Sequence, residues 1–248
     1  MVGEYVLKMH PFVLFLYLVG CSTLPDTLVD NRYREGYNGI KSSEKVLIVP
    51  ISMEYRELSE DRERVTQSLK SRFEENGMSV SVLNEEIYWN VWGEVLKEVG
   101  GIYSPINGLI DKTKYENALT KFISKTSRSE DFSVVIFPAL IIKKAKTSGG
   151  SARWDGVKRR VLTKGVLLKG ASFSGNVEGL SLQVMVLDSS ANWLSTTYGG
   201  LVLPYYEKLD NLRVPSKELK QNLFSNDLHI NEGVDIALSP LFSPVNFP

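Results

Sequence analysis

This chain has few of the residues from which metal and thiol sites are built. It contains one cysteine, Cys21, and two histidines, His10 and His229, among 248 residues. One cysteine excludes a disulfide within the chain, and two isolated histidines exclude a histidine cluster or an HExxH zinc motif. Lysine plus arginine equals aspartate plus glutamate at 29 each, so no net charge draws the chain to nucleic acid. We therefore expect no metal and no cofactor.

Motifs for nucleotide binding and nucleophilic catalysis are missing as well. The chain has neither a P-loop nor a GxGxxG. Residues 170–174 (GASFS) depart from the nucleophile elbow GxSxG at the last position. Residues 188–192 (DSSAN) begin like a calcium loop, but Trp193 and Gly199 stand where glycine and glutamate are needed, which favours a plain turn. We expect a non-enzymatic protein with no catalytic residue.

Apolar runs are short, and the most informative one lies near the amino terminus. Residues 11–21 (PFVLFLYLVGC) are too few to span a bilayer, and they end in Cys21. Lys8 supplies a weak basic start before the run, and Gly20 supplies a small residue before the cysteine. These are the parts of a secretory signal.

The segment Leu18-Val19-Gly20-Cys21 resembles the lipobox of bacterial lipoproteins. That resemblance implies that residues 1–20 are a signal peptide, that cleavage falls between Gly20 and Cys21, and that Cys21 carries two or three acyl chains such as palmitate. Because two or more chains bind a bilayer almost irreversibly, the protein would be anchored in a membrane. Ser22, rather than aspartate, follows the cysteine. This favours the outer membrane with the domain facing the periplasm; the inner membrane and the cell surface are the alternatives.

After the signal, the sequence predicts a polar tether over residues 21–44 and a single domain over residues 45–248. The tether is polar and is interrupted by Pro25, Gly36 and Gly39. The alternative is that Tyr33 and Tyr37 dock part of this stretch on the domain.

The domain begins with a pattern typical of a βαβ unit. Residues 46–49 (VLIV) form a buried strand, and an amphipathic helix over 59–76 begins at a Ser59 N-cap. An alternating strand follows over 78–83, so the two strands are expected to be parallel. Further along we expect helices beginning at Asn84 and around 115–123, a strand at 132–137 that reaches either its end or a sheet edge at Pro138, a hairpin over 180–203, and a short helix over 234–241.

These elements predict an α/β (mixed α+β) fold, one domain with a mixed sheet that is parallel early and antiparallel late. Their order resembles a group of periplasmic α/β lipoprotein domains. The group includes activators of penicillin-binding proteins, the curli-secretion lipoprotein and the amino-terminal domain of the Tol-system propeller protein. The matching parts are VLIVP at 46–50, the helix over 59–76, VVIFP at 134–138 and the hairpin over 176–203. The resemblance implies a non-catalytic module that binds partners.

One segment departs from the balanced charge of the chain. Residues 143–169 contain nine basic residues and one acid, Asp155. Gly149 and Gly150 predict a hairpin turn here, with Trp154 near its tip. The candidate surface for an anionic partner comprises Lys143, Lys144, Lys146, Arg153, Lys158, Arg159 and Arg160. The alternative is a solvated ribbon whose lysines protect a sheet edge.

The main hypothesis is a membrane-anchored lipoprotein whose domain binds an envelope protein or an anionic envelope polymer. Loops after Pro50 and Pro138 are further candidate surfaces, because the carboxyl ends of parallel strands border binding crevices. One alternative is a periplasmic hydrolase that uses carboxylates. Another is an oligomeric secretion-pore lipoprotein, for which the charged segment 143–169 is poorly suited.

Overall fold

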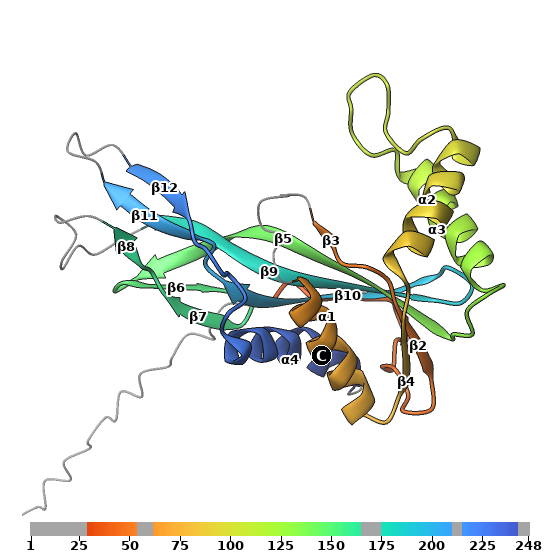
Figure 1. Cartoon of the computed structure of the whole chain (residues 1–248), viewed down its shortest axis with the longest axis horizontal. Helices are drawn as coiled ribbons and strands as arrows, with labels where there is room; N and C mark the ends of the chain where they lie inside the picture. The colour runs from red at the N-terminus through yellow and green to blue at the C-terminus, as the bar shows by residue number, and fades with distance from the viewer. Residues whose placement is uncertain (1–28, 54–61, 165–174, 210–214, 243–248) are drawn as a thin grey trace, which may run out of the picture.

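The computed structural model describes residues 29–53, 62–164, 175–209 and 215–242; the expected signal peptide, Gly20 and Cys21 lie outside them. Within this part of the chain, four helices pack on one large sheet, and a small second sheet lies near one end (Figure 1). The fold is the single mixed α/β domain that the sequence predicts.

The large sheet is parallel in its first half and antiparallel in its second. Its main strands follow the order β1-β10-β9-β5-β2-β4. Strand β2 runs parallel to both β4 and β5, whereas β9 is antiparallel to its neighbours β5 and β10. The bounds are β1 Arg32–Tyr33, β2 Lys45–Ile48, β3 Ser52–Met53, β4 Ser79–Val82, β5 Val134–Ser148, β9 Gly175–Asp188 and β10 Trp193–Val202.

The expected βαβ unit is present as β2, α1 (Arg62–Glu75) and β4. Val65, Leu69 and Phe73 recur every four residues on α1, and all three are completely buried. Gly77, at φ +81°, follows the end of the helix, in a conformation that disfavours an L side chain. The expected N-cap Ser59 lies outside the described residues.

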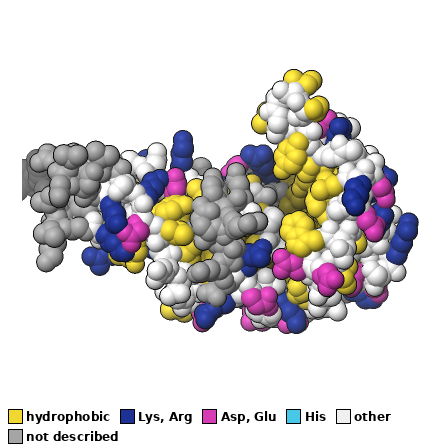
Figure 2. All heavy atoms as spheres, turned by 45° about the horizontal axis from the view of Figure 1, so that its top comes forward, with side chains coloured by type: hydrophobic (Ala, Val, Ile, Leu, Met, Phe, Trp, Pro, Cys, Tyr) yellow, Lys and Arg dark blue, Asp and Glu magenta, His cyan; other side chains and the backbone are white. Residues whose placement is uncertain are grey.

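Helices cover both faces of the sheet. α1 and α4 (Asp227–Phe242) pack on one face through a core that includes Ile48, Leu182 and Val234. α2 (Glu85–Val99) and α3 (Lys112–Thr126) pack on the other face through a core that includes Val135 and Phe122. The loop between α2 and α3 projects from the body of the molecule (Figure 1, Figure 2).

Helix α2 begins at Asn84, as the sequence predicts. The Asn84 side-chain oxygen accepts hydrogen bonds from the backbone N–H groups of Glu86 (2.8 Å) and Ile87 (3.3 Å). Asn84→Ala is therefore expected to lower the free energy of unfolding by about 1 kcal/mol, measured by urea denaturation. Asn84→Asp keeps the acceptor and should remain close to wild type; equal stability of both variants with wild type would contradict the cap.

Of the two alternatives at Pro138, the strand end is wrong, since β5 continues to Ser148. The residues before Pro138 pair with β2 as far as Ile136, and pairing with β3 starts at Ala139. Pro138 thus falls where one neighbouring strand ends and the next begins. The missing N–H costs no ladder hydrogen bond there, which is where a sheet tolerates proline.

The expected hairpin is formed by β9 and β10. Leu180, Leu182, Val184 and Val186 alternate along β9 and are completely buried. The turn between the strands is closed by Asp188, whose carboxylate accepts the backbone N–H groups of Ser190 and Asn192 at 2.9 and 2.8 Å.

Part of the expected tether is packed on the domain, in agreement with the docking alternative. β1 pairs with β10, the rings of Tyr33 and Tyr37 stack with centroids 6.0 Å apart, and Tyr37 and Ile40 are buried. The backbone N–H of Ile40 donates to the Leu241 carbonyl at the end of α4 (2.7 Å). Two aromatic rings and one isoleucine supply enough apolar surface to hold this polar segment in place.

Helix α4 is longer than expected and contains Pro240 in its last turn. It begins near Asn226, whose side chain accepts the Leu228 N–H (3.1 Å). Pro240 lies only two residues from the end of the helix, so it removes a single donor, while the fully buried Leu241 holds the final turn against the core.

Beyond the helices, the long strands continue into an antiparallel ribbon. β5 turns at Gly149 and Gly150 into β6 (Ser151–Trp154), which turns again into β7 (Val157–Arg160). The first turn is the expected one, but Trp154 is buried beside the second turn rather than exposed at a tip. β8 (Thr163–Lys164), β11 (Tyr205–Leu209) and β12 (Pro215–Leu219) form the small sheet.

Candidate functional site

Five of the seven predicted basic residues share one face of the β5–β6–β7 ribbon. Lys146 lies opposite Arg153, and Arg153 lies opposite Lys158. Residues directly opposite one another in an antiparallel pair point to the same face, and so do residues two apart on a strand. Lys144 and Arg160 are therefore on this face too. We call Lys144, Lys146, Arg153, Lys158 and Arg160 the basic face.

The opposite face of the ribbon is apolar and anchors it. Ala152, Trp154 and Val157 are buried in a third core together with Val161 and Leu203, and Ile236 of α4 packs against this core. Because this side faces the body of the domain, the basic face is directed toward solvent.

Lys143 does not belong to the basic face, which corrects the sequence prediction for this residue. Its Nζ donates to the buried Asp155 carboxylate (3.0 Å) and lies 3.5 Å from the centre of the Tyr198 ring. The other Asp155 oxygen accepts from the hydroxyl of the fully buried Ser181 (2.6 Å). The single acid of the basic segment thus neutralises a lysine inside the fold.

Arg159 is also internal, which is a second correction, because only 7% of its surface is exposed. Its Nε donates to the Leu201 carbonyl (2.8 Å), and one terminal nitrogen reaches the Glu232 carboxylate on α4 (2.7 Å). Strand alternation places it on the face opposite Lys158 and Arg160. Arg159 therefore joins β7, β10 and α4.

Four of the five cations of the basic face are not neutralised by acids that the structure describes. Lys144, Lys146, Lys158 and Arg160 make no ion pair with any other residue that the structure describes. Glu178 lies opposite Lys144 on β9, but its carboxylate is taken by Lys217 (2.7 Å). Like charges on adjacent strands repel one another, so a bound anion would relieve this repulsion.

At its β7 end the basic face meets a pocket of about 400 Å³. Its basic groups come from β7, from the segment after β12 and from the first turn of α4, and no carboxylate residue lines it. Its apolar wall includes Leu162, Leu203 and Tyr206. The basic groups are Lys158, Arg159, Arg160, Lys220 and His229.

The pocket is cationic and partly shielded from water. Lys220 Nζ donates to the Leu203 carbonyl (2.8 Å), and burial lowers the pKa of Lys220 from its ordinary value, although the Glu207 carboxylate opposes this. Burial, and after it the Arg159 cation, lowers the pKa of His229. An anion entering such a pocket would be attracted more strongly than at an open surface. The sequence could not reveal this pocket, because its residues come from separate segments.

A groove does border the carboxyl ends of β2 and β4, as expected for the loop after Pro50. It has a volume of about 620 Å³, and its charged groups are of both signs. Arg62 here pairs with Glu85 (3.6 Å) and donates to the Ile51 carbonyl (3.3 Å). The expected loop after Pro138 does not exist, because Pro138 lies within β5.

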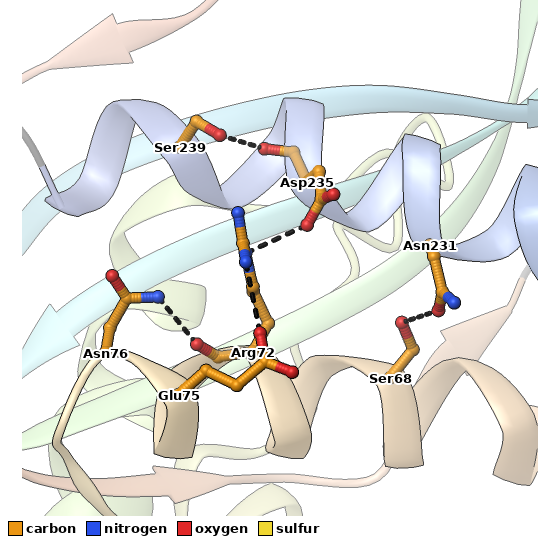
Figure 3. Close-up of polar contacts among 7 residues, drawn as sticks. All are labelled: Ser68, Arg72, Glu75, Asn76, Asn231, Asp235 and Ser239. Carbon is orange, nitrogen blue, oxygen red and sulfur yellow. Dashed lines mark hydrogen bonds and ion pairs between the residues drawn. The ribbon is translucent and has the colours of Figure 1, made fainter.

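A groove of about 750 Å³ lies between α1 and α4 and is lined by several acids. Arg72 of α1 contacts Asp235 of α4 (2.9 Å) and Glu75 (3.0 Å), and Ser68 donates to Asn231 (2.8 Å), as Figure 3 shows. Both carboxylates pair with Arg72, and Asp235 thereby joins the two helices, so neither is poised as the acid or base of a hydrolase.

No helix in the described part of the chain is long and apolar enough to cross a membrane. No group of three or more His, Cys, Asp or Glu side chains among those residues is placed to hold a metal ion.

No protein-family model and no curated protein sequence matches this chain. Among solved structures, it is similar to the PelC dodecamer from Paraburkholderia phytofirmans, with a TM-score of 0.38, 10% identity, and coverage of 87% of this chain and 99% of that one. It is also similar to the LpoB C-terminal domain from Salmonella enterica, with a TM-score of 0.29, 11% identity, and coverage of 66% of this chain and 85% of that one. At these scores the similarity carries no argument about function, which rests instead on the residues of this chain.

Proposed function

We propose that this chain is a lipid-anchored envelope protein whose α/β domain binds, without catalysis, a partner that carries closely spaced carboxylates or phosphates. The observation that carries the proposal is the basic face, where four cations without ion pairs to described residues lie on β5 and β7, the two strands on either side of β6. Strands in a sheet lie about 4.8 Å apart, so an anionic chain could contact several of these cations at once.

The pocket next to the basic face supports the same function. An anionic group would meet Lys158, Arg160 and Lys220 there, while an attached apolar or sugar-like part would lie on Tyr206 and Leu162. Charge-assisted hydrogen bonds from lysine and arginine are about twice as strong as neutral ones, so this pocket can fix the register of a repeating ligand.

The anchor in this proposal is Cys21, acylated after removal of residues 1–20, with the outer membrane as its location. The lipobox-like Leu18-Val19-Gly20-Cys21 supports it. Metabolic labelling with a palmitate analogue tests it directly: label is expected on wild type and not on Cys21→Ala. Label that persists on Cys21→Ala would contradict the anchor without affecting the basic face.

The basic face is tested by Lys158→Glu/Arg160→Glu, which leaves the buried Arg159 intact. The matched control is Lys41→Glu/Arg128→Glu, which makes the same charge change at an exposed lysine and an exposed arginine outside the ribbon. Poly-L-glutamate and polyphosphate serve as probes. We expect the ribbon variant to bind them about tenfold more weakly at low salt, because two attractive contacts become repulsive.

The control variant should bind these probes like wild type, and crosslinking in intact cells should lose a partner only in the ribbon variant. Equal binding by the two variants would mean that net charge, not the basic face, governs the interaction. That result would contradict the proposal.

A further inference from the structure

The loop between α2 and α3 is unusually apolar for a projecting segment. No charged residue occurs between Glu98 and Asp111. Figure 2 shows hydrophobic side chains at the end of the projection. We call residues 102–110 the apolar loop.

Four large apolar side chains of the apolar loop are more than half exposed. Ile106 is 93% exposed, Leu109 65%, Tyr103 62% and Ile110 54%. A contiguous group of exposed apolar side chains on a projection marks a contact surface, whereas single ones need no explanation.

Four backbone N–H groups of the apolar loop donate hydrogen bonds to acceptors within the loop. Ser104 N–H donates to the Leu109 carbonyl (2.7 Å) and Gly108 N–H donates to the Ser104 carbonyl (2.9 Å). The Ile106 and Leu109 N–H groups donate to the side-chain oxygens of Ser104 (3.3 Å) and Asn107 (3.0 Å). The loop therefore exposes apolar side chains on a backbone that needs few partners from its surroundings.

This combination fits lipid better than protein. Acyl chains offer no hydrogen-bond partners, so a loop that enters them must pair its own polar groups, whereas a protein surface could supply the missing bonds. Four partly exposed side chains also fall short of the about 800 Å² per partner that a stable protein interface buries, which argues against a second copy of the chain.

The charges beside the loop complement a phospholipid surface. Lys97 lies in the last turn of α2 and Lys114 in the first turn of α3, so the two lysines flank the base of the loop. Neither makes an ion pair with another described residue. Lysines at this level can reach lipid phosphates while Tyr103 occupies the interface between headgroups and acyl chains.

We propose that the apolar loop inserts into the interfacial region of a phospholipid bilayer and so orients the domain on the membrane. Ile106, Leu109 and Ile110 enter the acyl boundary, and Lys97 and Lys114 contact phosphates. The inference rests on the loop alone and not on acylation of Cys21, so either can fail without the other.

The test uses the whole chain with Cys21→Ser, which leaves no other cysteine. A dye whose emission rises in apolar surroundings is attached through Ile106→Cys, and in the control through Ser71→Cys, an exposed site on α1 over the opposite face of the sheet. Vesicles of phosphatidylethanolamine and phosphatidylglycerol are the probe. At position 106 we expect the emission to shift to the blue and rise about twofold, with quenching by lipids that carry a quencher near the headgroup.

At position 71 we expect no change in dye emission, even if residues 11–21 bind both labelled proteins to the vesicle. Adding Leu109→Asp/Ile110→Asp should abolish the change in emission at position 106. Because both residues are exposed, these substitutions leave the core intact. An unchanged emission at position 106, or equal changes at both positions, would overturn the proposal. So would crosslinking of position 106 to a second copy or another protein without a response to vesicles.

Discussion

Gly199→Ala is expected to lower the free energy of unfolding by about 3 kcal/mol or more, the largest effect of any conservative change considered. A Cβ on Gly199 would lie 1.9 Å from the Gly233 carbonyl oxygen and 3.0 Å from the Ala237 backbone nitrogen. Both obstacles are backbone atoms of α4, so no rotation of a side chain can relieve the clash.

Gly199 has no room for a side chain because α4 lies directly against the backbone of β10. A Cβ on Gly233 would lie 2.4 Å from the Gly200 carbonyl oxygen, so the contact excludes side chains from both directions. The pairing of β10 with β9 also shifts register between Gly200 and Val202, which places a bulge beside this contact. An added methyl group must push the helix away from the sheet and open the core around Val234 and Leu238.

Gly93→Ala is the matched control, because a Cβ there meets nothing within 4 Å and the residue lies inside α2. Alanine should stabilise this helix by about 0.5–1 kcal/mol through its higher helix propensity. Urea denaturation followed by circular dichroism measures both changes. If Gly199→Ala falls within about 0.5 kcal/mol of wild type, the close approach of α4 and β10 does not exist in solution.

Much of the fold could be predicted because local patterns agree with the tertiary arrangement. The buried run at 46–48, the four-residue spacing on α1 and the alternation at 180–186 each specify one element, and the structure contains all three. A glycine pair inside a strand, as at 199–200, is typical of a bulge or a close backbone approach, and the structure has a register shift and a close approach of α4 there.

The errors have a common cause, which is that a local pattern does not identify a distant partner. Pro138 disfavours a strand interior, but the sequence cannot show that the neighbouring strand changes at that point. The polar character of residues 29–44 indicates a tether, whereas the site that receives Tyr37 and Ile40 is built by other segments.

Part of the candidate site could have been predicted more sharply from alternation alone. Residues 143, 145 and 147 lie on one face of β5, so Lys143 shares the buried face with Ala145, while Lys144 and Lys146 face outward. The same rule separates Arg159 from its two neighbours on β7. The partners of the inward cations, Asp155 and Glu232, could not be assigned without the fold, because they depend on turns and on α4.

Asp155→Ala should be the second most damaging change, with a loss of about 2–4 kcal/mol in the free energy of unfolding. Asp155 is 6% exposed and holds Lys143 and the hydroxyl of Ser181 at once. It also adopts φ +37°, a region that aspartate and asparagine tolerate better than alanine. Its removal leaves a largely buried lysine without a partner and weakens the turn between β6 and β7, on which the alignment of the basic face depends.

Asp155→Asn separates charge from shape, because asparagine can still accept the Ser181 hydroxyl and occupy the same backbone conformation. We expect an intermediate loss for this variant and a coupling of about 1–3 kcal/mol in a double-mutant cycle with Lys143→Met. Asp131→Asn is the control, since Asp131 pairs with Lys45 while 81% of its side chain is exposed, and it should change stability by less than about 0.5 kcal/mol. Equal losses for Asp155→Asn and Asp131→Asn would show that the internal ion pair contributes no more than a surface one, and the β6–β7 turn would then be held by its apolar face alone.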